Sequence, residues 1–162
     1  MTEKLLWFLL VAVLFVSCQK EDKKPAKPVS KHILVDVNGN PVPLPEDKLI
    51  VLNFMAYSCT ACMKEIPVMK KVIQEPPFRD KFQIIAMVID SDKPDLSDPL
   101  FPIYPNNRHN FVRFPVPGTP TTYIITPQGK KLVIIYGAVT EENFRKFLKQ
   151  ALEKAKNISH SW

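Results

Sequence analysis

Residues 49–67 have the sequence LIVLNFMAYSCTACMKEIP, in which a continuous apolar run leads directly into two cysteines separated by two residues. Residues 49–56 are apolar except for Asn53, a pattern typical of a strand buried on both faces beside parallel neighbours. The residues that follow the cysteines have helical spacing. This stretch therefore predicts a buried strand, a short turn and a helix over residues 60–74 that begins at the cysteines.

The two thiols have the environment of a redox pair. Unpaired N–H groups and the positive end of the helix dipole favour a thiolate at a helix start. Cys62 lies one turn after Cys59, so the two sulfurs can form a reversible disulfide. We predict that Cys59 is the nucleophile that attacks a substrate disulfide and that Cys62 then releases the reduced substrate.

Two other interpretations of the cysteine pair are a permanent structural disulfide and half of a zinc site. Zinc normally takes four Cys or His ligands. The chain has three cysteines and three scattered histidines, without a second CxxC pair. We therefore expect neither a bound metal nor another cofactor.

The first residues are typical of a targeting signal. Residues 5–16 form an apolar run that is short for a transmembrane span and suits a signal peptide. The run ends in Ser17-Cys18, which resembles the bacterial lipoprotein signal. We predict a signal peptide over residues 1–17 and lipid attachment at Cys18; the alternative is an uncleaved signal anchor. Either places the domain outside the cytoplasm, where disulfides persist.

The rest of the chain is predicted to be a tether and one domain. Residues 18–31 are rich in Lys and Pro and predict a flexible tether, which leaves residues 32–162 as the domain. Hydrophobic residues at 46% and charged residues at 23% are globular values. The net charge is +6, but basic residues are not interleaved with aromatic ones, so we expect no nucleic-acid partner. We expect a monomer.

Further elements are predicted along the chain. A hairpin is expected over residues 31–44, with a turn at 38–40 and an edge strand weakened by prolines. The remaining predictions are a buried strand over 82–89, a long loop over 90–105, a short helix within 106–114, an antiparallel strand pair at 121–126 and 131–136, and a final helix capped by Thr140. This α/β order, a hairpin followed by a mixed sheet flanked by helices, resembles the thioredoxin fold.

A more specific resemblance covers residues 33–152. The chain is similar to the TlpA/ResA group of membrane-tethered, extracytoplasmic thioredoxin-like proteins. Four segments carry the resemblance: residues 53–62, 64–67, 118–125 and 127–130. The resemblance implies a thiol–disulfide oxidoreductase that reduces protein disulfides, such as the haem-site cysteines of apocytochrome c, and that a membrane thiol donor keeps reduced.

The resemblance also implies residues around the cysteine pair. It implies a cis peptide bond at Pro120, packed against the CxxC motif. Thr119 and Pro120 are expected to face the substrate, where extended backbone can pair with a substrate strand; the alternative is a plain turn. The chain departs from the group at Ser58, where the group usually has tryptophan. We therefore expect Ser58 to contact the substrate in a way that differs from the tryptophan of the group.

Two polar residues can serve the proton transfers. Glu65 lies three residues after Cys62, on the same helical face, and can take a proton from that thiol. The alternative is a solvent-facing glutamate paired with Lys64 or Lys70. Asn53 stands where ordinary thioredoxins have an aspartate, which favours Glu65 as the proton acceptor. The alternative for Asn53 is a buried amide satisfied by the backbone.

A second function remains open at this point. The same scaffold can bind or reduce copper if a histidine joins the two cysteines as a ligand. His109, in the connection between the two halves of the fold, is the candidate ligand. The alternative for His109 is an ordinary solvated loop residue.

Overall fold

The computed structural model describes residues 32–159. The predicted signal peptide over residues 1–17, the lipid attachment at Cys18 and the tether over residues 18–31 lie outside this range. Among the described residues, no helix combines the length and the apolar character that crossing a membrane requires.

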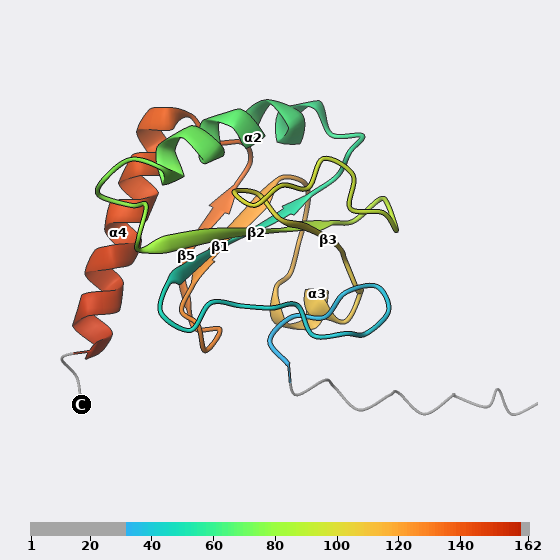
Figure 1. The fold of residues 1–162 in the computed structure, drawn as a ribbon, viewed down its shortest axis with the longest axis horizontal. Helices are drawn as coiled ribbons and strands as arrows, with labels where there is room; N and C mark the ends of the chain where they lie inside the picture. Colours follow the sequence, from blue (N-terminus) through green and yellow to red (C-terminus); the bar gives the residue numbers. More distant parts are fainter. Residues whose placement is uncertain (1–31, 160–162) are drawn as a thin grey trace, which may run out of the picture.

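Five strands form one mixed sheet in the order β3-β2-β1-β4-β5 (Figure 1). β1 is parallel to β2, β2 is parallel to β3, and β4 is antiparallel to both β1 and β5. The strands are β1 Leu49–Met55, β2 Phe82–Val88, β3 Ile103–Pro105, β4 Thr121–Ile125 and β5 Lys131–Tyr136. β1 is central, as its apolar run predicts, but only one of its two neighbours is parallel.

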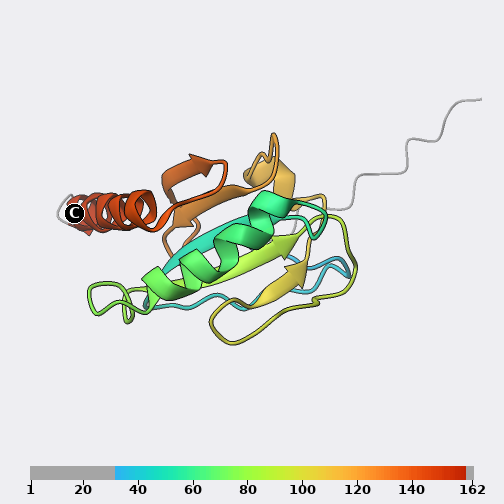
Figure 2. The same ribbon diagram turned by 90° about the horizontal axis from the view of Figure 1, so that it is seen from above.

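Helices cover both faces of the sheet. α2 (Thr60–Ile73) and α4 (Glu141–Ser159) lie on one face, and α3 (Asn110–Arg113) lies with the N-terminal segment on the other (Figure 1). Seen from above, α2 crosses over β1 and β2 (Figure 2). Alternate β1 residues are buried in two separate hydrophobic clusters, Val51 and Met55 in one and Leu52 and Phe54 in the other. Both faces of β1 are thus core, which explains its lack of polar alternation.

Two local predictions need correction. The predicted loop over residues 90–105 ends in the short strand β3, which pairs with β2 in parallel register. The predicted N-terminal hairpin forms its turn at residues 38–40, but its arms contain no regular strand and pair through one bridge between Val35 and Pro41 and the hydrogen bond from the Val42 N–H to the Leu34 carbonyl (3.1 Å). Asn110 also fixes this segment, because its buried side chain accepts from the Val35 N–H (3.1 Å) and donates to the Val35 carbonyl (2.8 Å). The segment therefore covers the sheet as an anchored loop.

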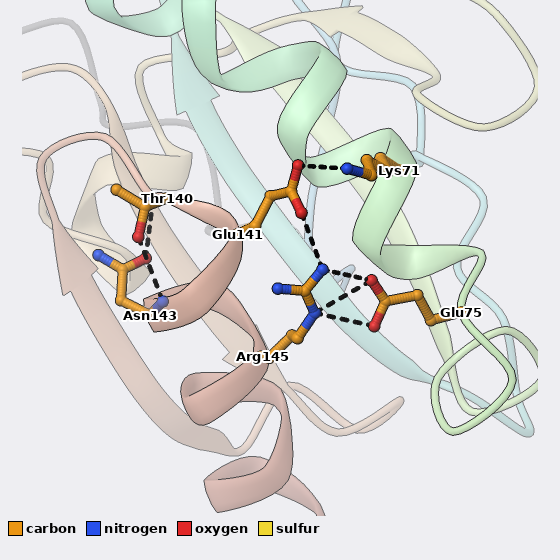
Figure 3. A network of polar contacts seen from close by, with 6 residues as sticks. All are labelled: Lys71, Glu75, Thr140, Glu141, Asn143 and Arg145. Carbon is orange, nitrogen blue, oxygen red and sulfur yellow. Dashed lines mark hydrogen bonds and ion pairs between the residues drawn. The ribbon is translucent and has the colours of Figure 1, made fainter.

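A network of ion pairs joins α2 to the start of α4 (Figure 3). Arg145 contacts both carboxylate oxygens of Glu75 and also Glu141, which in turn pairs with Lys71 at 2.6 Å. The Thr140 hydroxyl accepts from the Asn143 N–H (3.3 Å), which confirms Thr140 as the cap of α4. These contacts fix the point at which the chain enters α4. They thereby also fix the preceding residue, Val139, which reaches the candidate site.

Candidate active site

The two cysteines lie at the turn between β1 and α2. The Cys59 N–H donates to the Ala56 carbonyl (3.2 Å), and Cys59 then caps α2, with its sulfur accepting from the Cys62 N–H at 3.2 Å. The cysteines form a disulfide, with Cα atoms 5.3 Å apart. Cys59 is half-buried, whereas Cys62 is completely buried. A substrate can therefore approach the sulfur of Cys59 but not that of Cys62.

The loop before β4 lies beside the disulfide. Antiparallel pairing of β1 with β4 places Thr121 opposite Phe54, so residues 118–120 come level with the cysteine turn. The Thr119–Pro120 peptide bond is cis, and the Thr119 carbonyl oxygen is 3.6 Å from the Cys59 sulfur. Ser58 is exposed, Thr119 is half-buried and Pro120 is buried. The predicted substrate residues thus lie together around Cys59, and their contact with a substrate stays a prediction.

Glu65 is buried beneath the cysteines, with 1% of its surface exposed. Its Oε1 accepts from the Asn53 amide (2.8 Å), and its Oε2 accepts from the Val139 N–H (3.0 Å). Burial raises the pKa of Glu65, and the hydrogen bonds from Val139 and Asn53 lower it by less. The structure excludes the solvent-facing alternative, since Lys70 pairs with Asp98 instead.

Asn53 links three elements under the disulfide. Its side-chain amide, on β1, donates to Glu65 on α2 and to the Thr122 hydroxyl on β4 (2.9 Å). Its partners are side chains, so the alternative of an amide satisfied by the backbone is wrong. The Asn53 Oδ1 atom is buried without a hydrogen-bond partner. The amide is thus held by its donor side alone, and that side faces the Glu65 carboxylate.

Sequence reasoning missed Asp90 and Val139. The Asp90 carboxylate accepts from the N–H groups of Tyr57 and Ser58, immediately before Cys59. Asp90 follows β2 by two residues, and the carboxyl ends of parallel strands meet at one edge of a sheet, so its position after a buried strand was a usable signal. Val139 contributes only its backbone N–H, for which the sequence contains no signal.

His109 is placed away from α2. It is an exposed residue at the start of α3, which lies on the opposite face of the sheet from α2 (Figure 1). Over residues 32–159 the structure contains no group of three Cys, His, Asp or Glu side chains placed to hold a metal ion. Copper binding with His109 as a ligand stays a prediction without support from this geometry.

Comparison with known proteins decides the family. The family model described as a thioredoxin-like domain matches residues 42–152. The chain belongs to the thioredoxin-like family. Within this family, it is 31% identical to the thiol-disulfide oxidoreductase ResA of Oceanobacillus iheyensis over 89% of this chain and 84% of that protein. ResA of Bacillus subtilis is 26% identical over 80% of this chain and 76% of its own length.

Solved structures show the same thioredoxin-like fold. A thiol:disulfide interchange protein from Chlorobium tepidum has a TM-score of 0.58 at 23% identity and covers 73% of this chain and 90% of its own. The exposed lipoprotein thioredoxin of Streptococcus pneumoniae has a TM-score of 0.55 at 20% identity, over 72% of this chain and 96% of its own. The predicted fold and the resemblance to ResA are therefore confirmed, and the protein is a thiol–disulfide oxidoreductase that acts on protein thiols.

Proposed function

We propose that this oxidoreductase works outside the cytoplasm as a reductant of protein disulfides, with Cys59 as the nucleophile and Glu65 as the proton acceptor of Cys62. The observation that carries the proposal is the buried Glu65 carboxylate, one helical turn from the buried Cys62 thiol. Water has no ready access to a thiol at this depth, so its proton requires an acceptor inside the protein. A carboxyl group with a raised pKa suits that role at near-neutral pH.

The first step forms a mixed disulfide. The Cys59 thiolate, favoured by its position at the start of α2, attacks one sulfur of the substrate disulfide. A bond forms between Cys59 and that sulfur, the substrate S–S bond breaks, and the other substrate sulfur leaves as a thiolate. The Thr119 carbonyl beside Cys59 supports this step as an acceptor for an extended substrate strand.

The second step resolves the mixed disulfide. Cys62 transfers its proton to the Glu65 carboxylate, and the resulting thiolate attacks the Cys59 sulfur. The Cys59–Cys62 bond forms, the bond between Cys59 and the attacked substrate sulfur breaks, and that sulfur leaves with its electron pair as a thiolate. Two electrons pass from the cysteine pair to the substrate, whose thiolates take up two protons. A donor dithiol must then return two electrons to the pair.

The proposed substrates are proteins with exposed disulfides, and the haem-site cysteines of apocytochrome c are the first candidate. A membrane thiol donor is the proposed source of electrons. The exposed Ser58 supports a substrate surface different from that of relatives with an aromatic residue at this position. Exchange rates with a disulfide-bonded CxxCH peptide and with a shuffled peptide of the same composition test this choice. Equal rates would remove apocytochrome c as the candidate.

Location forms a separate part of the proposal. The apolar run before Cys18 supports a lipid-anchored protein, with residues 18–31 as its tether. A structural neighbour that is itself described as an exposed lipoprotein agrees with this location. Labelling with a fatty-acid analogue tests it: wild type takes up label, and Cys18→Ala does not. Label retained by Cys18→Ala would contradict lipid attachment at this residue.

An insulin-reduction assay and a redox equilibrium against glutathione test the reaction. Wild type is expected to turn over, and Cys59→Ser is expected to be inactive. A reductant should have a potential near the value of about −270 mV known for thioredoxin, whereas a strong oxidant lies near about −120 mV. Turnover that is the same in wild type and Cys59→Ser, or a potential in the oxidant range, would overturn the proposal.

A further inference from the structure

A carboxylate stands directly against the turn that carries Cys59. β1 and β2 are parallel, with Met55 opposite Val88, and the Ile89 N–H donates to the Met55 carbonyl (2.9 Å). The chain therefore leaves both strands at the same edge of the sheet. Asp90, the next residue, comes to lie beside residues 56–59.

Both carboxylate oxygens of Asp90 are engaged by this turn. Oδ1 accepts from the Tyr57 N–H (2.8 Å), and Oδ2 accepts from the Ser58 N–H (3.0 Å). These N–H groups belong to the two central residues of the turn that the Cys59 N–H closes onto Ala56. Burial raises the pKa of Asp90, but the hydrogen bonds from Ser58 and Tyr57 together lower it by more. Asp90 therefore carries its charge at every pH at which the thiols react.

Cys59 directly follows Ser58, so a negative charge on Asp90 is expected to disfavour the Cys59 thiolate, by a small amount because Asp90 is exposed to water. The start of α2 favours that thiolate, and a nearby carboxylate disfavours it. Pairs with a stabilised reduced form are stronger oxidants, so a group that opposes the thiolate makes the pair more reducing. Tyr57 in the turn, Asp95 in the following loop and the buried Glu65 on α2 are further titratable groups of this region, and they stay the same in the variants below.

Ser58 connects this carboxylate with the point at which the chain departs from the TlpA/ResA group. Ser58 donates its backbone N–H to Asp90 (3.0 Å), and its side chain also lowers the pKa of this carboxyl group. We propose that Asp90 is a positioning residue that holds the Cys59 turn and lowers the reduction potential of the Cys59–Cys62 pair by opposing the Cys59 thiolate. This inference rests on the proposed function in one respect, namely that Cys59 is the reacting thiol.

Asp90→Asn tests the inference, because it removes the charge and keeps the size of the side chain. In the reduced variant, the thiolate-to-thiol ratio of Cys59 at fixed pH should rise about threefold, which corresponds to a pKa lower by about 0.5. Ultraviolet absorbance of the thiolate measures this ratio. The same threefold change corresponds to a potential about 15 mV less negative in equilibrium with glutathione. Asp80→Asn is the matched control, since it removes one exposed charge just before β2 and should change neither quantity.

The outcomes separate this inference from the proposed function. An unchanged or raised Cys59 pKa in Asp90→Asn, or a change matched by Asp80→Asn, overturns the role of Asp90. If Asp90→Asn does not fold, Asp90→Ser, which keeps one acceptor oxygen, is measured against the same expectation. Failure of the proposed function is detected in wild type alone, as a potential in the range of strong oxidants. The test of Asp90 uses the difference between wild type and variant, which does not depend on the absolute potential of wild type.

Discussion

Two polar clusters of opposite character join helix α2 to the region where α4 begins. The buried cluster, near its first turn, consists of Asn53, Glu65, Thr122 and the Val139 N–H. The ion-pair cluster, near its last turn, consists of Lys71, Glu75, Glu141 and Arg145, all partly exposed (Figure 3). Both clusters reach the start of α4. They differ in that the first encloses one carboxyl group away from water, whereas the second pairs several charges within reach of it.

The difference shows how one helix combines attachment with chemistry. Exposed ion pairs are screened by water and salt, so the ion-pair cluster fixes the helix with little effect on the thiols. A single carboxyl group away from water has a raised pKa and can exchange a proton with its neighbour. The buried carboxyl group of Glu65 is the one that lies beside the cysteines. Variants in the two clusters should therefore give different kinds of effect.

The largest expected effect follows Glu65→Gln. Without a carboxylate to accept the Cys62 proton, resolution of the mixed disulfide should slow about 100-fold, the lower range for loss of a general base. Stopped-flow exchange with a disulfide peptide measures this rate. Glu75→Gln, the same change in the ion-pair cluster, should stay within about twofold of wild type. Similar rates for Glu65→Gln and Glu75→Gln would remove the distinction between the clusters.

A smaller effect is expected for Asn53→Ala. The variant leaves Glu65 and Thr122 without their buried donor, so the free energy of unfolding should fall by about 1–3 kcal/mol. Because the Asn53 hydrogen bond lowers the pKa of Glu65, that pKa should also rise further in the variant. Urea unfolding and a carboxyl titration by NMR measure the two changes. A loss of stability with an unchanged Glu65 pKa would limit Asn53 to a packing role.

The pH dependence of stability should have opposite signs in the two clusters. The folded pKa of Glu65 is raised above 4.5, so the folded state binds more protons above that pH, and wild type should lose stability relative to Glu65→Gln as pH rises through the folded pKa. A difference of one between the folded and unfolded pKa corresponds to about 1.4 kcal/mol of unfolding free energy. Urea unfolding of both proteins from pH 4 upwards, about the ordinary range of a carboxyl group, measures the difference. A difference that does not vary with pH would contradict the raised pKa.

In the ion-pair cluster, hydrogen bonds from Arg145 lower the pKa of Glu75, and those from Lys71 and Arg145 lower the pKa of Glu141. The contribution of these two carboxylates to stability should therefore be present above pH 4.5 and disappear as pH falls through the lowered pKa.

The smallest expected effect is that of Lys71→Ala at neutral pH, a fall in Tm of less than about 2 °C. Calorimetry measures it, and a larger fall that persists in high salt would show that this cluster is not screened.

Much of the site could be predicted from residues 49–67, because a buried strand, a CxxC pair and a helix follow one another there without interruption. Glu65 could be placed by helical spacing alone. β3 could not be predicted, since its three residues lie at the end of a proline-rich segment and its pairing with β2 has no sequence pattern of its own. Val139 could not be found either, because a backbone N–H has no residue type. Asp90 could be placed at the site only with knowledge of which strand ends lie side by side in the sheet.

The most direct test of the central claim is an NMR titration of the Glu65 side-chain carboxyl in the reduced protein. The buried cluster predicts a pKa above the ordinary value of 4.5, because burial outweighs the hydrogen bonds from Val139 and Asn53. A pKa at or below 4.5 would contradict the claim that Glu65 is a buried proton acceptor for Cys62.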